Sequence, residues 1–319
     1  MSSLLENCPI CDSERVKYRW TAEDAQGNTW RYDACPDCGT IFLNPPLEAS
    51  ELGKFYDDFY YGPGHRRFKG EVEGMVPVFR RFRAKRVERL IPQGGAVLDV
   101  GCGRGVFLDI LAKKGFRCLG TERSAPAAQN ASKRIKVMVG DIENLALPAE
   151  SFDLVTFWQV LEHLNNPKAA IAETHRILKS GGRMLLQVPN PESLQARASG
   201  PYWFHLDPPR HLHLFGLQCL DEMCARFGFV REKVSHLSFE YGPFGALQSF
   251  WNILGMRRDL LYNWMMAADK SEIPPSAAAR AVLIAASAIS APIATLFSIV
   301  EATSQGGIIE VVYRKKPLE

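Results

Sequence analysis

The chain has 319 residues, of which 46% are hydrophobic and 23% are charged. This composition supports a sizeable core and excludes a fibrous or disordered protein. The 38 basic and 35 acidic residues give a formal net charge of +3, so charge alone does not indicate a nucleic-acid partner. The N-terminus has no basic leader followed by an apolar segment, so the sequence predicts no secretory signal and a cytoplasmic location.

Four of the eight cysteines form two C-x-x-C pairs, separated by a strand-forming segment. They are Cys8, Cys11, Cys35 and Cys38. Two such pairs are typical of a tetrahedral zinc site made of four thiolates. Disulfides are disfavoured without a secretory signal, and a redox C-x-x-C does not need two copies. The sequence therefore predicts a zinc ribbon over residues 1–45, in which the metal stabilises a small fold and leaves no position open for a substrate.

Residues 46–92 are predicted to form a linker followed by a basic amphipathic helix. Pro-Pro and Gly-Pro-Gly sequences interrupt the linker, which is rich in aromatic residues. The helix, residues 78–90, has apolar residues at mostly helical spacings and a basic outer face. Its basic residues are Arg80, Arg81, Arg83, Lys85, Arg86 and Arg89. That face is either solvated or contacts anionic lipid headgroups or a phosphorylated substrate.

A glycine-rich turn follows an apolar segment, Ala96–Val100, that has the composition of a buried parallel strand. Gly101, Gly103 and Gly105 stand between this strand and a helical segment. Such a turn lets a ligand approach the backbone beside the amides of a helix N-terminus. The dinucleotide fingerprint requires Gly or Ala at its sixth position, where this chain has Val106. A ligand without a pyrophosphate is therefore favoured.

Further strands are predicted in the order that a doubly wound sheet needs, and polar residues follow several of them. The second strand ends at Glu122, about twenty residues beyond the glycines, where an acid can bind both ribose hydroxyls. Asp141 follows the third strand, and Gln159, Glu162 and His163 follow the fourth. A fifth strand comes after a Gly-Gly pair. Because the carboxyl ends of parallel strands share one edge, these residues are expected at the ligand-binding edge of the sheet.

Five motifs in succession resemble those of class I S-adenosylmethionine-dependent methyltransferases: VLDVGCGRG, GTERS, GDIENLALP, VLEHLNNP and ILKSGGRMLLQVPNP. The resemblance implies an α/β fold with a Rossmann-like doubly wound, seven-stranded mixed sheet over residues 93–319. In this chain the fold would carry an N-terminal zinc ribbon and a C-terminal helical insertion. The resemblance also implies S-adenosylmethionine as the cofactor and methyl transfer as the activity.

The resemblance further implies a role for each residue at this edge. The residues that would cradle the methionine part of the cofactor are Asp99, Gly101, Gly103 and Gly105. Glu122 would hold the ribose. Asp141 and the backbone at Ile142 would bind the adenine, and Gln159 would lie beside the methionine moiety.

Two histidines are candidates for the catalytic base. The methyl carbon of a sulfonium is electrophilic enough for an in-line displacement, so the protein mainly aligns the acceptor and removes its proton. His163 follows the fourth strand. His211 lies in a histidine-rich segment that resembles a stretch of bacterial methyltransferases joined to zinc ribbons. Each can instead be structural: His163 as a packed histidine, and His211 as part of a lid.

The acceptor is expected to be a small molecule methylated on oxygen, such as a sugar, a quinone-like compound or a secondary metabolite. Two other functions stay open: an RNA methyltransferase with a zinc ribbon, and a cofactor-binding scaffold without catalysis. In the ribbon, acidic residues outnumber basic ones, which disfavours phosphate binding. Nucleic acid is therefore the less favoured partner.

Residues 240–305 are predicted to be a helical insertion before the last strand. They include residues 281–300, a run without a charge that has the length of a membrane-spanning helix. A single crossing would separate the last strand from its sheet, and a second would carry Arg257, Arg258 and Asp259 through hydrocarbon. The sequence instead predicts a pair of helices with apolar faces. They would pack on the core, cover the substrate, contact a second subunit, or dip into one leaflet at the inner membrane face.

Overall fold

The computed structural model describes residues 3–56, 68–256, 258–266 and 277–317. Residues 57–67 of the predicted linker and 267–276 of the predicted insertion lie outside this description. The chain divides into two compact units, neither of which is continuous in sequence. The first consists of Met1–Tyr60, Val188–Leu220 and Ser235–Glu310, and the second of Tyr61–Gln187, Asp221–Val234 and Val311–Glu319.

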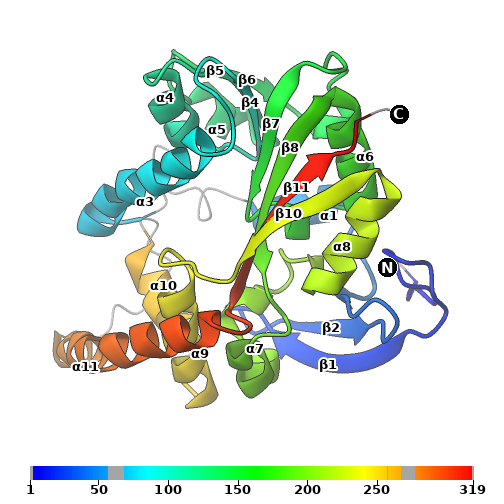
Figure 1. Cartoon of the computed structure of the whole chain (residues 1–319). Helices are drawn as coiled ribbons and strands as arrows, with labels where there is room; N and C mark the ends of the chain where they lie inside the picture. The colour runs from blue at the N-terminus through cyan, green and yellow to red at the C-terminus, as the bar shows by residue number, and fades with distance from the viewer. Residues whose placement is uncertain (1–2, 57–67, 257, 267–276, 318–319) are drawn as a thin grey trace. The chain divides into compact units, whose positions relative to one another are not determined.

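Within the described residues, a seven-stranded sheet in the order β10-β11-β8-β7-β4-β5-β6 forms the centre of the second unit (Figure 1). Its strands are β4 (Ala96–Val100), β5 (Arg117–Glu122), β6 (Lys136–Val139), β7 (Phe152–Trp158), β8 (Leu178–Pro189), β10 (Phe229–Ser235) and β11 (Ile308–Lys315). The pairs from β6 through β5, β4 and β7 to β8 are parallel, and β4 is buried along its whole length. The predicted doubly wound fold is confirmed, with the last strand inserted between β10 and β8.

The helices of the second unit begin at local signals in the sequence. Their bounds are α3 (Gly70–Glu88), α4 (Val106–Ala112), α5 (Ala125–Gln129) and α6 (Pro167–Ile177), with short 3₁₀ helices η3 (Ile142–Asn144) and η4 (Leu161–His163). Helix α8 (Leu217–Arg226) has residues in both units. Ser124 and Asn166 cap α5 and α6 by accepting hydrogen bonds from backbone amides, and a proline stands in the first turn of each helix.

The predicted ribbon has a strand that sequence analysis did not foresee. In the described residues, the first unit holds a four-stranded sheet in the order β1-β2-β3-β9. Its strands are β1 (Lys17–Glu23), β2 (Thr29–Ala34), β3 (Ile41–Leu43) and β9 (His213–Leu214). Strand β9 comes from the histidine-rich segment, and its Leu214 pairs with Ile41 of β3. The ribbon and this segment share one core, in which Tyr32 and Trp203 are fully buried.

The remaining helices of the first unit are short, except for two in the insertion. They are α1 (Ala49–Leu52), η1 (Gly53–Phe55), α7 (Leu194–Ser199), η5 (Gly200–Tyr202), η6 (Phe204–Leu206), α9 (Gly242–Ile253), α10 (Leu260–Met265) and α11 (Ala277–Ala302). The first predicted helix of the insertion is divided into α9 and α10, since Gly255 in the corner has a φ of 77°. Helix α11 packs along α9 (Figure 1).

Candidate cofactor-binding site and cysteine cluster

The predicted cofactor-binding residues all lie in the second unit, at or just beyond the carboxyl ends of neighbouring strands. Asp99 is in β4 and Glu122 ends β5, while Asp141 follows β6 and Gln159 follows β7. These strands are adjacent and parallel, so their carboxyl ends share one edge of the sheet. This edge is where doubly wound folds bind their ligands.

The glycine-rich loop follows β4 in a conformation that favours glycine at three positions. The φ angles are 68° at Gly101, 54° at Gly103 and 67° at Gly105, which precedes α4. A Cβ at Gly101 would lie 2.6 Å from Cγ2 of Val160, so this glycine permits a close approach to the chain after β7. A Cβ at Gly103 would meet nothing within 4 Å. The backbone at Gly103 is therefore open to a ligand.

The carboxylate of Glu122 joins the loop to the second strand. One oxygen accepts a hydrogen bond from the amide of Gly103 at 2.9 Å, and the other accepts one from the amide of Ser124 at 3.0 Å. The acid that the resemblance assigns to the ribose therefore also fixes the glycine loop. Because both oxygens accept backbone hydrogen bonds, the carboxylate is held in one orientation at the edge of the sheet.

Asp99 is a buried acid on the central strand. The hydroxyl of Thr156 on β7 donates a hydrogen bond to its carboxylate at 2.7 Å. Burial raises the pKa of Asp99 to about 7, although this hydrogen bond and the charge of Arg83 oppose the rise. A positively charged ligand at this edge would favour the ionised form of Asp99.

Asp141 and Ile142 lie at the start of η3, as expected for a segment that contacts one end of a ligand. Arg123, the residue after Glu122, donates a hydrogen bond to the Asp141 carboxylate and forms an ion pair with it. This pair was not predicted from the sequence. The one local sign of it is that Arg123 directly follows Glu122, a predicted cofactor-binding residue. The side chain of Ile142 is buried, and only its backbone is suited to bind a ligand.

Gln159 has a strained backbone and a buried side-chain nitrogen. Its φ is 57°, which is rare for a residue other than glycine, and its own amide donates to the carbonyl of Gln187 at 2.8 Å. The side-chain nitrogen Nε2 is buried and has no hydrogen-bond partner among the described residues. Buried donors of this kind are rare in native proteins unless a ligand or water completes them. This donor, the open backbone at Gly103 and the fixed acid Glu122 fit a cofactor with amino-acid and ribose groups.

Helix α3 corrects the expected arrangement of the basic helix. Phe82, predicted on the inner face, is 58% exposed, whereas Arg83, predicted on the outer face, is buried. The Arg83 guanidinium lies 4.7 Å from the centre of the Trp158 ring. Arg83 can be buried because its guanidinium makes a cation–π contact with Trp158 and lies near the acid Asp99. These two interactions offset the cost of burying the charge. The exposed basic residues of α3 are Arg81 and Lys85. They lie on the same side of the helix as the exposed Val78 and Phe82, so this face is not uniformly basic.

The two candidate bases belong to different units. His163 ends η4 in the second unit, and its amide donates to the carbonyl of Val160. His211 is buried in the first unit, where its Nδ1 lies 2.7 Å from the carbonyl oxygen of His205. A carbonyl only accepts, so Nδ1 carries a hydrogen and Nε2 is the basic nitrogen of the neutral ring. Asp207 lies 3.8 Å from this Nε2.

The four predicted metal ligands come together in the first unit. The Sγ atoms of Cys8, Cys11, Cys35 and Cys38 all lie within 4.8 Å of one another. Sγ of Cys8 lies 3.7 Å from that of Cys38, and Sγ of Cys11 lies 3.5 Å from that of Cys35. A tetrahedral zinc ion with Zn–S distances of about 2.3 Å requires sulfur–sulfur distances of roughly 3.8 Å. The cluster therefore fits a Zn²⁺ ion bound by four thiolates.

The environment of the thiols also favours a cation. The hydrogen bond with Cys38, together with burial, raises the pKa of the Cys8 thiol, and burial raises the pKa of Cys11 to about 11. Thiols this close do not all ionise unless a positive ion lies between them. Cys219 from α8 is close enough to Cys38 to raise the pKa of its thiol. No local pattern in the sequence indicates this fifth cysteine, because it lies far from the other four along the chain.

The sheet order and the glycine loop define the class I methyltransferase fold. Residues 77–234 match the family described as "Methyltransferase domain". A "Ubiquinone biosynthesis O-methyltransferase" of Coxiella burnetii is 33% identical over 155 residues, 45% of this chain and 63% of that protein. A putative methyltransferase of Encephalitozoon cuniculi is 29% identical over 218 residues, 63% of this chain and 97% of that protein. Residues 77–234 therefore have the sequence and the fold of a methyltransferase domain, as the resemblance to class I S-adenosylmethionine-dependent methyltransferases implied.

The comparisons extend unevenly along the chain. An uncharacterised protein in a transposon of Streptomyces fradiae is 36% identical over 110 residues, and the chain spans 32% of its length. The chain thus spans less than two thirds of this protein and of the Coxiella enzyme. Among solved structures, the [4+2]-cyclase SpnF matches with a TM-score of 0.53 and 19% identity. The match covers 86% of this chain and 98% of the SpnF chain. This likeness concerns the fold alone, and a cyclase with the same fold means that the fold does not define the reaction.

Proposed function

We propose that the protein is an S-adenosylmethionine-dependent methyltransferase that acts on a hydroxyl group of a small molecule. The observation that carries the proposal is the fixed Glu122 carboxylate beside the open backbone of Gly103 and the unpartnered amide of Gln159. The likeness to a ubiquinone biosynthesis O-methyltransferase supports an oxygen acceptor such as a quinone-like compound. Sugars and secondary metabolites with hydroxyl groups belong to the same acceptor class.

The cofactor would lie along the edge of the sheet and supply an electrophilic methyl group. Its methionine part would contact the loop from Asp99 through Gly105, with the Gln159 amide as an additional donor. Glu122 would accept hydrogen bonds from the ribose hydroxyls, and Asp141 with the backbone of Ile142 would bind the adenine. The protein's contribution would be mainly to hold the acceptor oxygen in line with the methyl group.

Removal of the acceptor proton would fall to His163 or His211. The hydrogen bond from Nδ1 of His211 to the His205 carbonyl holds the ring in the tautomer with a basic Nε2. Asp207, near that nitrogen, would stabilise the imidazolium formed when the proton is taken up. His211 therefore has the tautomer that a general base requires. The pH dependence of methyl transfer in the His163→Gln and His211→Gln variants distinguishes the two candidates.

The zinc ion would have a structural role and the protein would work in the cytoplasm, where thiols stay reduced. Two ribbon arginines are paired with acids: Arg15 with Asp37 at 2.7 Å and Arg31 with Asp33 at 2.8 Å. Arginines paired in this way are less available to phosphates, which favours a small-molecule acceptor over RNA.

Calorimetry with S-adenosylmethionine tests the cofactor site. We expect Glu122→Gln to weaken binding at least about tenfold, because the neutral amide binds the ribose and the Gly103 loop less well. Asp141→Asn should weaken binding similarly. Glu88→Gln is the matched control, since Glu88 pairs with Lys114 on the surface. Wild-type affinity in both site variants would remove the assignment.

A further inference from the structure

In residues 285–302 of helix α11, the buried residues are small or hydrogen-bonded, and the bulky apolar residues are turned outward. The outward residues Ile289, Ile293, Leu296 and Val300 are 59–71% exposed and lie on one side of the helix at spacings of four, three and four. The inward residues are small or hydrogen-bonded, including Ala294, Ser298 and Glu301. A surface helix in water has the opposite arrangement.

Exposed apolar residues of the insertion extend beyond this one helix. At the end of α9, Phe250, Ile253 and Leu254 are also exposed. In the described residues between 241 and 302 whose exposure is known, every exposed residue is apolar or glycine. We call the outward residues of α11 and this end of α9 the apolar face. Among the described residues, Ala285–Ala302 is the one helical stretch apolar enough to cross a membrane, and only 11% of it is buried. A core helix would be mostly buried.

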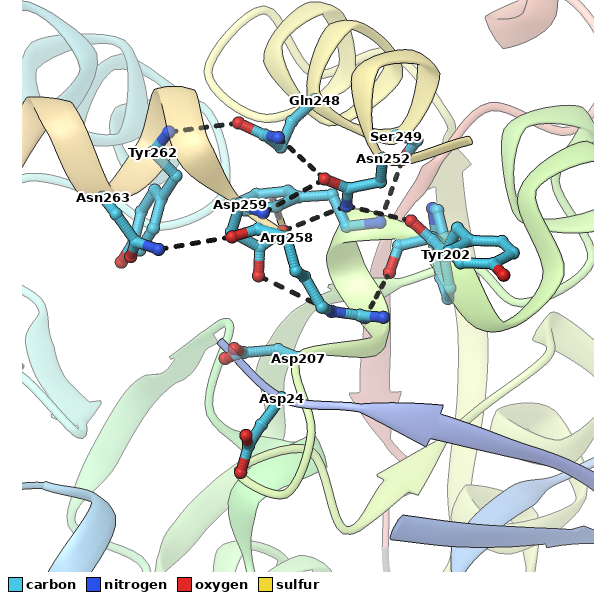
Figure 2. Close-up of polar contacts among 12 residues, drawn as sticks. Asp24, Tyr202, Asp207, Gln248, Ser249, Asn252, Arg258, Asp259, Tyr262 and Asn263 are labelled. Atoms are coloured by element: carbon cyan, nitrogen blue, oxygen red, sulfur yellow. Dashed lines mark hydrogen bonds and ion pairs between the residues drawn. The ribbon is translucent and has the colours of Figure 1, made fainter. Parts of the chain in front are cut away.

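Three charged residues of the insertion, Arg258, Asp259 and Glu301, are hydrogen-bonded inside the protein. Arg258, from the corner between α9 and α10, donates to the carbonyl of Pro201 at 2.7 Å. Asn252 donates to the carbonyl of Tyr202 and to Asp259, each at 3.0 Å (Figure 2). These contacts attach α9 and α10 to the segment around η5. The insertion is therefore held with its polar side inward, and its apolar side remains outside.

The far end of α11 is attached in the same way. The Glu301 carboxylate accepts hydrogen bonds from the backbone amide and the side-chain amide of Gln195, at 2.7 and 2.9 Å. A Cβ on Gly242 of α9 would lie 3.5 Å from Ser298, so small residues bring the two helices close together. Close contacts between small residues, with bulky aliphatic side chains facing away, are typical of helices that pack in lipid. Because both ends of the helix pair are attached, the pair is suited to lie along a membrane surface and not to cross it.

We propose that the apolar face inserts into one leaflet of a lipid bilayer. The choice of lipid over a second copy of the chain rests on charge. Interfaces between proteins in water have a polar rim around an apolar centre, whereas the exposed residues of α9 and α11 are all apolar wherever their exposure is known. An uncharged surface matches hydrocarbon. The contact is apolar, so it should not require anionic lipid, unlike contact through a basic helix.

Sedimentation of the full-length protein with phosphatidylcholine vesicles tests the proposal, without cofactor, so that the result is independent of methyl transfer. We expect wild type to sediment with neutral vesicles at both low and high salt. The double variant Ile293→Gln/Leu296→Gln should lower the partition coefficient at least about tenfold, because each substitution removes a large apolar side chain from the lipid. The control Leu4→Gln/Val230→Gln changes two exposed apolar residues elsewhere and should bind as wild type does.

Three outcomes would overturn the proposal. The first is wild-type protein that stays in the supernatant with neutral vesicles. The second is binding that occurs only with anionic phosphatidylglycerol, is abolished by salt and is unchanged in the α11 variant. The third is a lipid-free dimer, measured by light scattering, that the α11 variant converts to a monomer, since a second copy would then cover the face. Equal thermal stability of wild type and both variants ensures that each comparison concerns folded protein.

Discussion

A methyl group added at Gly101 would clash with the protein, whereas one added at Gly103 would enter open space. Substitution of the first glycine should therefore affect stability, and substitution of the second should affect cofactor binding. Gly101→Ala places Cβ 2.6 Å from Val160 at a positive φ, so we expect it to lower the free energy of unfolding by roughly 1–3 kcal/mol. Gly103→Ala should cost only about 1 kcal/mol, because the space is open. Its methyl group would occupy the proposed ligand space and weaken cofactor binding at least about tenfold. Thermal melts and calorimetry measure the two effects, and wild-type affinity in Gly103→Ala would contradict the site.

Asp99 gives the proposed cofactor site a pH dependence. Burial raises its pKa to about 7, so the free folded protein holds a proton that the unfolded chain releases near its usual pKa of 3.8. This contribution to stability is present at low pH and is lost as the pH rises through about 7. A cationic cofactor would favour the carboxylate, so binding at about pH 6 should release a proton. Calorimetry in buffers of different ionisation enthalpy measures this release, which Asp99→Asn should abolish; buffer-independent binding in wild type would refute it.

His205 makes the first unit sensitive to acid. Burial lowers its pKa from 6.5 to about 4, and its Nε2 lies 3.3 Å from the carbonyl of Tyr241. The stability from neutral His205 is present above about pH 6.5 and is lost as the pH falls through about 4, amounting to roughly 3 kcal/mol. His205→Gln should flatten the decline in unfolding free energy over this range. A decline as steep as that of wild type would assign the acid sensitivity to other groups.

At the scale of elements, the cysteine cluster should determine whether the ribbon stays folded. Strands β1, β2 and β3 are short, and the predicted zinc ion would join their two C-x-x-C turns. Chelation of the metal, or Cys35→Ser, should therefore expose the backbone amides of β2 and β3 to hydrogen exchange while those of β4 and β7 stay protected. Cys118→Ser, on β5 outside the cluster, is the control. Unchanged protection of β2 after metal removal would contradict a structural role.

Some elements could be predicted from sequence because their signals are local. The strand, glycine loop and helix from Ala96 to Ala112 follow from an apolar run and three glycines, and the structure has them there. The faces of α3 could not be predicted in this way. A helical pattern puts arginine outside and phenylalanine inside, but a distant partner, Trp158, brings Arg83 inward. Strand β9 could not be predicted either, because its two residues are too few for a strand pattern and form a strand only by pairing with β3.

For the whole molecule, the order of the motifs predicted the sheet, but it did not predict which segments of the chain form each compact unit. The prediction placed a ribbon at 1–45 and a methyltransferase core at 93–319 as consecutive parts, and the structure groups the ribbon with Val188–Leu220 and Ser235–Glu310. Contacts such as that between the Thr40 hydroxyl and the Leu214 carbonyl join residues 174 positions apart. Such pairings depend on the finished fold, so no local pattern reveals them. The positions of the proposed cofactor residues could be predicted because each follows its own strand, whereas partners such as Arg123 and Cys219 required the fold.

Transfer of a labelled methyl group tests the central proposal most directly. Full-length protein would be incubated with methyl-labelled S-adenosylmethionine and cell extract separated into lipid, nucleotide-sugar and RNA fractions. We predict label in a small-molecule fraction, the lipid or the nucleotide-sugar one, and loss of that label with Glu122→Gln but not with Glu88→Gln. Label in RNA would contradict the proposed acceptor class, and cofactor binding without label in any fraction would contradict methyl transfer itself.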